Sequence, residues 1–388
     1  MSERDRTGGP ELAADRHACR SCRGGDGRVV LDLGDQPAAD HFPARDDAGP
    51  DPVHPLQMWL CASCGLAQLL TDPTVPEEPR GAEPAALVEQ AADAVGRVGD
   101  AGWLPSGARV AEYGSPHGGS WAGLLTPRGL RSVSDSVPAD VVLDCFGMMH
   151  AADQAAAVRE RADRVAAGGV LLLQYHSLAT IARLGQWNSL RHGHYAYYST
   201  AALTRMLSAV GFGARTAWTF ELYGGTVLLA ATPAADGGPG PDPSVQALID
   251  DEASLGVEDP DRLAHLQQAA VSHAVEVRRW LETQRDEGRS VLGYGAASRA
   301  VALLCRAGVD NRLLPAIADA SPAKQGRRMP ATDIPVIAPG DLVAARPDAV
   351  LLFLPDLLAE VRARLAEVES SGGRWVDVDD LPSATGDR

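Results

Sequence analysis

The sequence predicts an α/β protein made of a small N-terminal zinc module, a truncated Rossmann-like sheet and a second Rossmann-like C-terminal domain. Three observations support this division. Two C-x-x-C pairs stand near the N-terminus, strand and helix patterns alternate over residues 85–234, and a strand, glycine loop and helix pattern restarts at residue 289. A chain of 388 residues is too long for one ordinary core. The glycine- and proline-rich stretch 235–243 reads as a linker between the last two parts.

The first part, residues 17–70, is predicted to close around a metal. Two C-x-x-C pairs can direct four thiolates at one point, which suits a tetrahedral zinc site. A thioredoxin-like redox motif needs only one such pair, at a strand-to-helix turn, and is the alternative. The pattern offers no further ligand, so the zinc is predicted to be structural. Residues 1–16 are polar and predicted to be disordered, and VVLDLG at 29–34 is a predicted strand. The predicted zinc ligands are Cys19, Cys22, Cys61 and Cys64.

The second part, residues 85–234, is predicted to be a parallel sheet covered by helices. Gly114 and Gly118 lie in the turn after its first strand, where a nucleotide-like ligand binds in such sheets. Only about twenty residues separate Gly119 from the next convincing strand at Asp140. That length leaves hardly any room for a second strand, its helix and a third strand, so the adenosine half of the site is predicted to be missing. Helices are predicted at 85–98 and 153–166, parallel strands at 139–146 and 168–175, and a closing antiparallel pair at 216–222 and 224–232.

The third part, residues 243–388, contains a long polar helix at about 262–287 and then a second strand, loop and helix pattern. The loop GYGAAS at 293–298 is suited to a phosphate, because backbone N–H groups and a helix N-terminus face the ligand there. The third glycine of a dinucleotide fingerprint is replaced by Ser298, so a tight turn without a ligand is the alternative. The predicted nucleotide contacts at this sheet edge are Tyr294, Gly295, Ala296, Arg299, Lys324 and Gln325.

The composition argues against two classes of partner. A formal net charge of −16 and an isoelectric point near 5.0 oppose binding to nucleic acid or to an acidic membrane surface. The longest apolar runs, such as VLLLQY at 170–175, are strand-sized and too short to span a membrane. The polar N-terminus lacks the apolar stretch of a signal peptide, so a cytoplasmic location is expected.

The segment LRHGHYAYYST at 190–200 concentrates side chains that transfer protons. The chain has 10 histidines and 7 tyrosines, yet two histidines and three tyrosines fall within this segment. Histidine and tyrosine are common general acids and bases, which favours a catalytic role. A chance cluster on a surface helix is the alternative. The predicted catalytic residues are His194, His192, Arg191, Tyr197 and Tyr198.

Taken in order, these features resemble the bacterial nucleotide-sugar C-methyltransferases, which methylate carbon 3 of thymidine-diphosphate 4-keto-deoxysugars for antibiotic glycosides. CRSCRG, LDLGDQPAADHF and LCASCGLAQL resemble the family's zinc module. GYGAASRAVALL, ADASPAKQGRRMPATDIPV and GGRWV resemble its C-terminal segments. The resemblance implies that S-adenosylmethionine binds in the first sheet, that a thymidine-diphosphate-linked sugar binds at the C-terminal domain, and that His194 removes the proton from carbon 3.

The departures from the family concentrate on the methyl-donor side. The family's tyrosine and glutamate before the last histidine are Arg191 and Gly193 here, and its earlier aspartate is Asn188. The acidic motif E-I-G-x-N-D-G reads EYGSPHG at 112–118, without the Asn-Asp pair. S-adenosylmethionine is therefore a doubtful cofactor for this chain.

Three functions follow from this pattern. The main prediction is an enzyme that enolises a nucleotide-linked 4-keto sugar without S-adenosylmethionine, and thereby epimerises, isomerises or eliminates. In it His194 is the base, Arg191 stabilises the enolate oxygen, and Tyr197 or Tyr198 returns the proton. The alternative is C-methylation through a shortened donor site. A third possibility, an inactive nucleotide-sugar-binding scaffold, is disfavoured because the histidines and tyrosines are retained.

Overall fold

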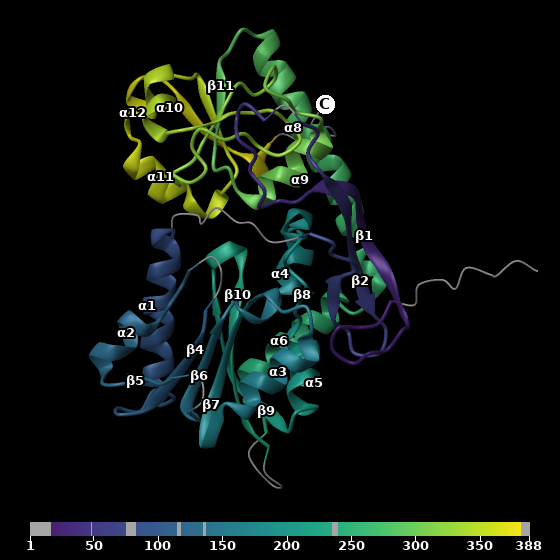
Figure 1. The fold of residues 1–388 in the computed structure, drawn as a ribbon, viewed down its shortest axis with the longest axis vertical. Coiled ribbons are helices and arrows are strands. Elements are labelled where there is room, and N and C mark those ends of the chain that lie inside the picture. Colours follow the sequence, from purple (N-terminus) through teal and green to yellow (C-terminus); the bar gives the residue numbers. More distant parts are fainter. Residues whose placement is uncertain are drawn as a thin grey trace, which may run out of the picture.

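The computed structural model describes residues 17–47, 49–74, 83–114, 118–134, 137–234 and 240–381. Within these residues the chain forms three sheets with helices around them (Figure 1). The predicted α/β class, with a Cys₄ module, a Rossmann-like sheet and a parallel C-terminal sheet, is confirmed. The segment predicted to be disordered, 1–16, lies outside the described residues. In the described part of the chain no helix is both long and apolar enough to cross a membrane.

The N-terminal sheet is an antiparallel meander that gains a strand from much later in the chain. β1 (Gly27–Pro37) pairs with β2 (Val53–Cys61), and β2 pairs with β3 (Ala67–Leu69). The fourth strand is β8 (Ala196–Tyr197), which pairs antiparallel with β3. Because β8 belongs to the segment rich in histidine and tyrosine, backbone hydrogen bonds hold that segment against the N-terminal module.

The second sheet has the strand order β5-β4-β6-β7-β10-β9. Its first four strands are parallel and its last two are antiparallel, so the predicted closing antiparallel pair is confirmed. The central strands read as continuous apolar runs because helices cover both faces of the sheet. In order, the strands are β5 (Arg131–Ser132), β4 (Arg109–Tyr113), β6 (Ala139–Cys145), β7 (Val165–His176), β10 (Thr226–Pro233) and β9 (Phe212–Phe220).

The expected shortage of room after the glycine turn is only partly right, because a second strand does fit. A single helical turn, α2 (Ala122–Leu125), and a 3-10 turn (Thr126–Arg128) lead directly into β5, which pairs in parallel with β4. The strand fits because the connecting helix has shrunk to little more than one turn. Within the described residues β5 is the edge strand, so no strand lies beyond it, and the chain passes from β5 to β6 on the other side of β4.

The helices of this unit cover the sheet in two groups. α1 and α2 lie on one face and α3 and α5 on the other, with a hydrophobic core on each side (Figure 1). The Asp153 carboxylate caps α3 by accepting from the Ala156 amide, and the Ser199 hydroxyl caps α5 in the same way. The helices are α1 (Ala85–Asp100), α3 (Gln154–Asp163), α4 (Leu178–Arg183) and α5 (Thr200–Ser208).

The C-terminal sheet is fully parallel, with the order β13-β12-β11-β14-β15. The strand order reverses beside β11, so the loop after β11 stands at the switch point where open α/β sheets bind ligands. The strands are β11 (Val291–Tyr294), β12 (Ile317–Ala318), β13 (Val336–Ile337), β14 (Ala349–Leu352) and β15 (Arg374–Asp377). The helices are α6 (Pro243–Leu255), α7 (Pro260–Leu263), α8 (His265–Asp286), α9 (Ser298–Ala307), α10 (Pro339–Ala345), α11 (Leu358–Arg364) and α12 (Glu367–Ser370).

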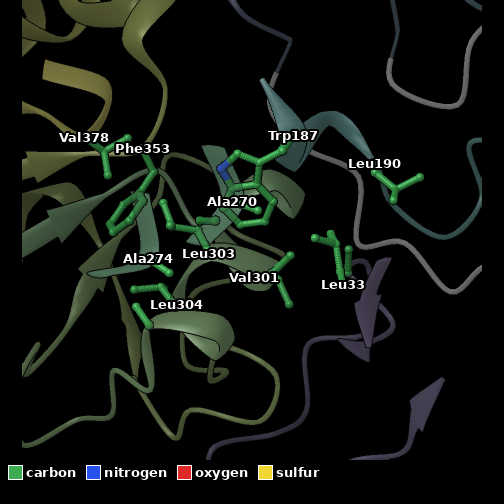
Figure 2. Packing of buried hydrophobic residues seen from close by; sticks show 14 of the residues in the cluster. Leu33, Trp187, Leu190, Ala270, Ala274, Val301, Leu303, Leu304, Phe353 and Val378 are labelled. Carbon is green, nitrogen blue, oxygen red and sulfur yellow. The ribbon is translucent and has the colours of Figure 1, made fainter. Parts of the chain in front are cut away.

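The N-terminal module and the C-terminal unit share one hydrophobic core. Leu33 of β1, Trp187 and Leu190 before β8, and Val301 of α9 belong to the same buried cluster (Figure 2). The cluster continues through Ala270 and Ala274 of α8 to Phe353 beyond β14. The segment that leads into β8 is therefore wedged between the first and the last parts of the chain.

A buried ion pair joins the same two parts, and we expect it to be important for stability. Both side chains of the Asp51–Arg328 pair are less than 10% exposed, and two N–H···O contacts of 2.6 and 2.9 Å link them. Burial alone would raise the pKa of Asp51, but the hydrogen bonds from Arg328 and the Ala331 amide outweigh it and hold that pKa below its ordinary value. Replacing Asp51 with alanine strands a buried guanidinium, so the free energy of unfolding should fall by roughly 3–5 kcal/mol.

Urea denaturation at neutral pH measures this loss, with Asp333→Ala as the control. The Asp333 carboxylate also approaches Arg328, at 3.5 Å, but it is 74% exposed, and we expect less than about 1 kcal/mol there. The Asp51 contribution is present above the unfolded-state pKa and is lost as the pH falls through the lower folded-state pKa. Equal losses in the two variants would contradict the assignment.

Candidate functional site

A cavity of about 230 Å³ lies where the second sheet, the segment around β8 and the C-terminal unit meet. The second sheet contributes the carboxyl ends of its parallel strands, and the C-terminal unit contributes the start of α9. The lining residues that bear on function are Gly118, Phe146, Met149, His150, His176, Asn188, Arg191, His194, Tyr197, Tyr223, Ser298, Arg299 and Lys324.

The N-terminal module holds the segment that carries His194. The Asp72 carboxylate accepts a 2.7 Å hydrogen bond from the Gly193 amide, and the Tyr195 carbonyl accepts one from Leu69. Gly193 has a φ of 81°, a left-handed conformation that a glutamate could adopt only with strain. The glycine found here in place of the family's glutamate therefore fits the local backbone.

Arg191 and His194 are in direct contact. The Arg191 Nε atom donates to the His194 Nε2 atom at 2.7 Å, and a second guanidinium nitrogen contacts the same atom. The His194 ring also meets the His150 ring edge-on, with ring centres 4.7 Å apart. The Tyr197 hydroxyl accepts from the Arg191 amide at 3.1 Å. Three of the predicted catalytic residues, Arg191, His194 and Tyr197, thus lie together at the cavity.

The other two predicted catalytic residues lie outside the cavity wall. The Tyr198 hydroxyl is buried and donates to the Gln154 side chain at 2.5 Å, and burial raises its pKa well above the ordinary value. His192 is buried with its Nε2 atom 3.1 Å from the Pro55 carbonyl, facing the N-terminal module. Both side chains fasten the segment to its neighbours, and neither faces the space where a substrate fits.

Sequence reasoning missed two histidines that line the cavity. His150 lies just after β6, with its Nδ1 atom 3.0 Å from the Gly193 carbonyl, and His176 ends β7. Burial, and then the charge of Arg299, lower the pKa of His176 to about 3, so its ring is neutral. The signal that could have found both is their position at the carboxyl ends of neighbouring parallel strands.

The cavity is positively charged in a chain that is acidic overall. Arg191, Arg299 and Lys324 approach it from three different segments. The Lys324 ammonium is buried and donates to the Ala296 carbonyl at 2.9 Å, which fixes it beside the loop after β11. A phosphate group at this loop would meet these cations as well as the N-terminus of α9.

The other predicted nucleotide contacts play different parts. Gly295 has a φ of 92°, and a Cβ atom there would press on the Leu354 side chain, so glycine is required for the turn. The Tyr294 ring is buried edge-on against Trp375, and the Gln325 amide donates to the Asp319 carbonyl. Tyr294 and Gln325 therefore shape the loop region from outside the cavity wall.

Reversing the charge of Arg299 should weaken nucleotide binding. Arg299 lines the cavity beside the α9 N-terminus, and a charge-assisted hydrogen bond to phosphate contributes about 1.5–3 kcal/mol. Arg299→Glu should raise the dissociation constant for thymidine diphosphate by roughly 10- to 100-fold in calorimetry. Arg312→Glu, at a side chain that is 90% exposed, is the matched control. Unchanged affinity in Arg299→Glu would mean that the loop is only a turn.

The glycine turn after β4 forms the opposite side of the cavity. A Cβ atom built on Gly114 would meet no atom of the described residues within 4 Å. The Glu112 carboxylate at the end of β4 is engaged by the Trp121 amide and the Ser120 hydroxyl. The Gly119 amide donates to the Glu83 carboxylate at 2.9 Å. Among the described residues of this turn, Gly118 lines the cavity, and an acidic side chain occupies the N–H group of Gly119.

The four predicted zinc ligands converge. All four sulfur atoms lie within 4.8 Å of one another, and the Cys19–Cys64 and Cys22–Cys61 pairs are 3.5 and 3.6 Å apart. Tetrahedral zinc with about 2.3 Å Zn–S bonds needs sulfur atoms about 3.8 Å apart, so the geometry fits the metal. The contact with Cys64 lowers the pKa of Cys19 to about 5, although burial acts in the opposite direction. The lowered pKa favours a thiolate at Cys19. The closed, four-sulfur arrangement is that of a structural site.

Comparison with known proteins agrees with this geometry. Residues 19–78 match the model of a zinc-binding domain, and residues 221–378 match the model of the C-methyltransferase C-terminal domain. The C-methyltransferase NovU of Streptomyces niveus is 22% identical over 398 residues, covering 92% of this chain and 94% of NovU.

Two solved structures are similar to part of the chain. A magnesium protoporphyrin IX methyltransferase from Synechocystis PCC 6803 is 14% identical over 38% of this chain and 84% of its own, with a TM-score of 0.29. A 1,6-didemethyltoxoflavin-N1-methyltransferase from Burkholderia thailandensis is 15% identical over 39% of this chain and 80% of its own, with a TM-score of 0.27. On the strength of its two domain matches and its end-to-end similarity to NovU, the chain belongs to the C-methyltransferase family that joins an N-terminal zinc-binding domain to this C-terminal domain.

Proposed function

We propose that the protein transfers a methyl group from S-adenosylmethionine to the carbon beside the ketone of a nucleotide-linked keto sugar. The observation that carries the proposal is that one cavity is bounded by Gly118 of the glycine turn, by His194 and by the cations Arg299 and Lys324. Methyl transfer requires the methyl donor and the nucleotide-linked sugar to be held next to each other. The glycine turn lines one side of this cavity and the cations line the other, so both molecules could bind in it.

The first chemical step assigned to the protein is removal of a proton from the carbon next to the ketone. An imidazole has a basicity suited to this task near neutral pH, and His194 is the candidate base. The electrons of the C–H bond then form an enolate, whose negative charge the surrounding cations and N–H donors stabilise. Arg299 and Lys324 hold the diphosphate, which orients the sugar toward His194.

The donor belongs at the glycine turn after β4. Two observations support this placement: no atom of the described residues crowds Gly114, and Gly118 lines the cavity. S-adenosylmethionine bound there supplies an electrophilic methyl group. The role of the protein is then to keep the enolate carbon facing the turn and to exclude water from the cavity.

Methyl transfer itself tests the proposal. The full-length, zinc-loaded protein is incubated with methyl-labelled S-adenosylmethionine and a thymidine-diphosphate 4-keto-deoxysugar. We expect label on a sugar carbon, at a rate that falls in His194→Ala. Retention of all label on the donor, while the sugar exchanges a proton with solvent, would exclude methyl transfer.

A second candidate is enolisation without a methyl donor, leading to epimerisation, isomerisation or elimination. Two observations favour it: the Glu83 carboxylate engages the Gly119 amide, and in the described residues no strand of the second sheet lies beyond β5. Both features reduce the number of hydrogen bonds that the protein can make to S-adenosylmethionine. Each 1.4 kcal/mol of lost binding free energy weakens the affinity tenfold. A donor dissociation constant no tighter than roughly millimolar in calorimetry, with a rearranged sugar as product, would favour this candidate.

A further inference from the structure

A continuous set of contacts links the candidate base to the nucleotide loop. The Ser298 hydroxyl, at the start of α9, donates to the Asp40 carboxylate at 2.7 Å. The same carboxylate oxygen lies 3.8 Å from a guanidinium nitrogen of Arg191. Arg191 in turn donates from Nε to the Nε2 atom of His194 at 2.7 Å. The guanidinium therefore stands between a carboxylate at the nucleotide loop and the imidazole.

The direction of the last contact determines the state of the base. A guanidinium has donors only, so the Nε2 atom of His194 must be the acceptor. The lone pair that would take a proton from the sugar is directed at Arg191 in this arrangement. His194 can act as a base through Nε2 only after Arg191 has moved away.

We propose that the diphosphate of the substrate draws Arg191 away from His194 and so uncovers the base. The inference rests on the proposed function, because it takes His194 as the base and the α9 loop as the diphosphate site. Arg191 is then a specificity-determining residue, since it restricts proton abstraction to sugars that carry a diphosphate.

Charge complementarity favours the exchange of partners. A diphosphate at the start of α9 carries the same sign of charge as Asp40 and competes with it for the Ser298 hydroxyl. A guanidinium binds phosphate through two parallel charge-assisted hydrogen bonds, which are stronger than a bond to a neutral imidazole. Arg191 is only 15% exposed, so it exchanges partners inside the site and has little access to bulk water.

Nitrogen NMR of histidine tests the uncovering directly. The full-length, zinc-loaded protein is labelled with ¹⁵N-histidine, and the His194 signals are assigned by their loss in His194→Asn. Saturating thymidine diphosphate should shift the Nε2 signal of His194, while thymidine without phosphate should leave it in place. In Arg191→Gln the signal should no longer respond to thymidine diphosphate, whereas Arg312→Gln should behave like the wild type.

Proton exchange in D₂O gives the functional counterpart. With a 4-keto-deoxysugar that carries no nucleotide, Arg191→Gln should exchange the proton roughly 10- to 100-fold faster than the wild type, because a hydrogen bond to the basic atom is gone. If Arg191 only stabilised the enolate, the same variant would exchange more slowly on every substrate, and the proposal would be overturned.

Two negative results would have different meanings. If calorimetry shows that thymidine diphosphate binds but the His194 signal does not move, the gating by Arg191 is wrong while the proposed function stands. If thymidine diphosphate does not bind, the nucleotide site fails and the gating fails with it.

Discussion

Replacing His194 with alanine should slow exchange of the sugar proton in D₂O by roughly two to four orders of magnitude, the usual contribution of a general base. The substrate is a thymidine-diphosphate 4-keto-deoxysugar, and no methyl donor is added, so the rate reports proton abstraction alone. The keto group makes the neighbouring C–H acidic enough for an imidazole. Affinity for thymidine diphosphate should not fall, because the cations Arg299 and Lys324 remain in place and Arg191 no longer has to leave His194.

His192→Ala is the matched control for this experiment. His192 lies two residues away, but its ring is buried against the N-terminal module, with Nε2 near the Pro55 carbonyl. We expect lower thermal stability and only a modest change in the exchange rate. If the wild-type protein binds the nucleotide sugar but exchanges its proton no faster than buffer does, the histidines and tyrosines of residues 190–200 have no catalytic role.

Removing the zinc ligands should abolish both the fold of the N-terminal module and the chemistry at His194. Structural zinc contributes folding free energy of about 10 kcal/mol or more in small domains, so Cys61→Ser should unfold the module. The structure adds a consequence for activity, because β3 of the module hydrogen-bonds to β8 and Asp72 holds the Gly193 amide. Proton exchange should therefore fall at least 100-fold, as judged from the free energy of those contacts.

The measurement combines zinc content by atomic absorption, a thermal melt and the exchange rate on the same sample. Cys305→Ser is the control, because Cys305 lies apart from the four-sulfur cluster and donates to the Pro330 carbonyl. Full exchange activity in a zinc-free Cys61→Ser protein would show that the catalytic segment holds its shape without the module.

Local patterns in the sequence were sufficient for most of the fold. The apolar runs at 139–146 and 168–175 are long enough to be buried strands, and they form β6 and β7. Two C-x-x-C pairs predict a four-sulfur site because each pair fixes two ligands within one turn. The loop after β11 was predictable because its glycines and the apolar helix behind it are contiguous in sequence.

The parts that could not be predicted depend on contacts between distant segments. β8 is only two residues long, which is too short for an alternation of apolar and polar residues to reveal the strand or its pairing with β3. Asp40 looks like an ordinary loop acid, and only the fold brings it to Arg191 and Ser298. Tyr197 and Tyr198 are adjacent, but successive side chains of an extended segment point to opposite sides. Tyr197 therefore lines the cavity, whereas Tyr198 lies in the hydrophobic core beside α3 and α5.

The strand β5 was missed because the residues between Gly119 and Asp140 were judged too few for a second strand, its helix and a third strand together. A connection in a parallel sheet usually needs about a dozen residues including its helix. Here α2 is four residues long, and a proline-containing 3-10 turn at Thr126–Arg128 completes the crossover. The site prediction erred in the same way for His150, whose strand was recognised while the residues just beyond it were not considered.

The ion pair between Asp51 and Arg328 has a consequence for how the chain is made. The two residues are 277 positions apart, whereas Cys19 and Cys64 are separated by 45. At roughly 5–20 residues per second, a ribosome needs about 14 to 55 seconds to synthesise the interval between the ion-pair partners. During that time the zinc knuckles can close, but Leu33 of β1 meets Trp187 and Leu190 only after a long delay, and meets Val301 of α9 later still. The nascent module therefore completes its core only when α9 has been made, and a fragment that ends before Ser298 should expose apolar surface of β1 that the full-length chain buries.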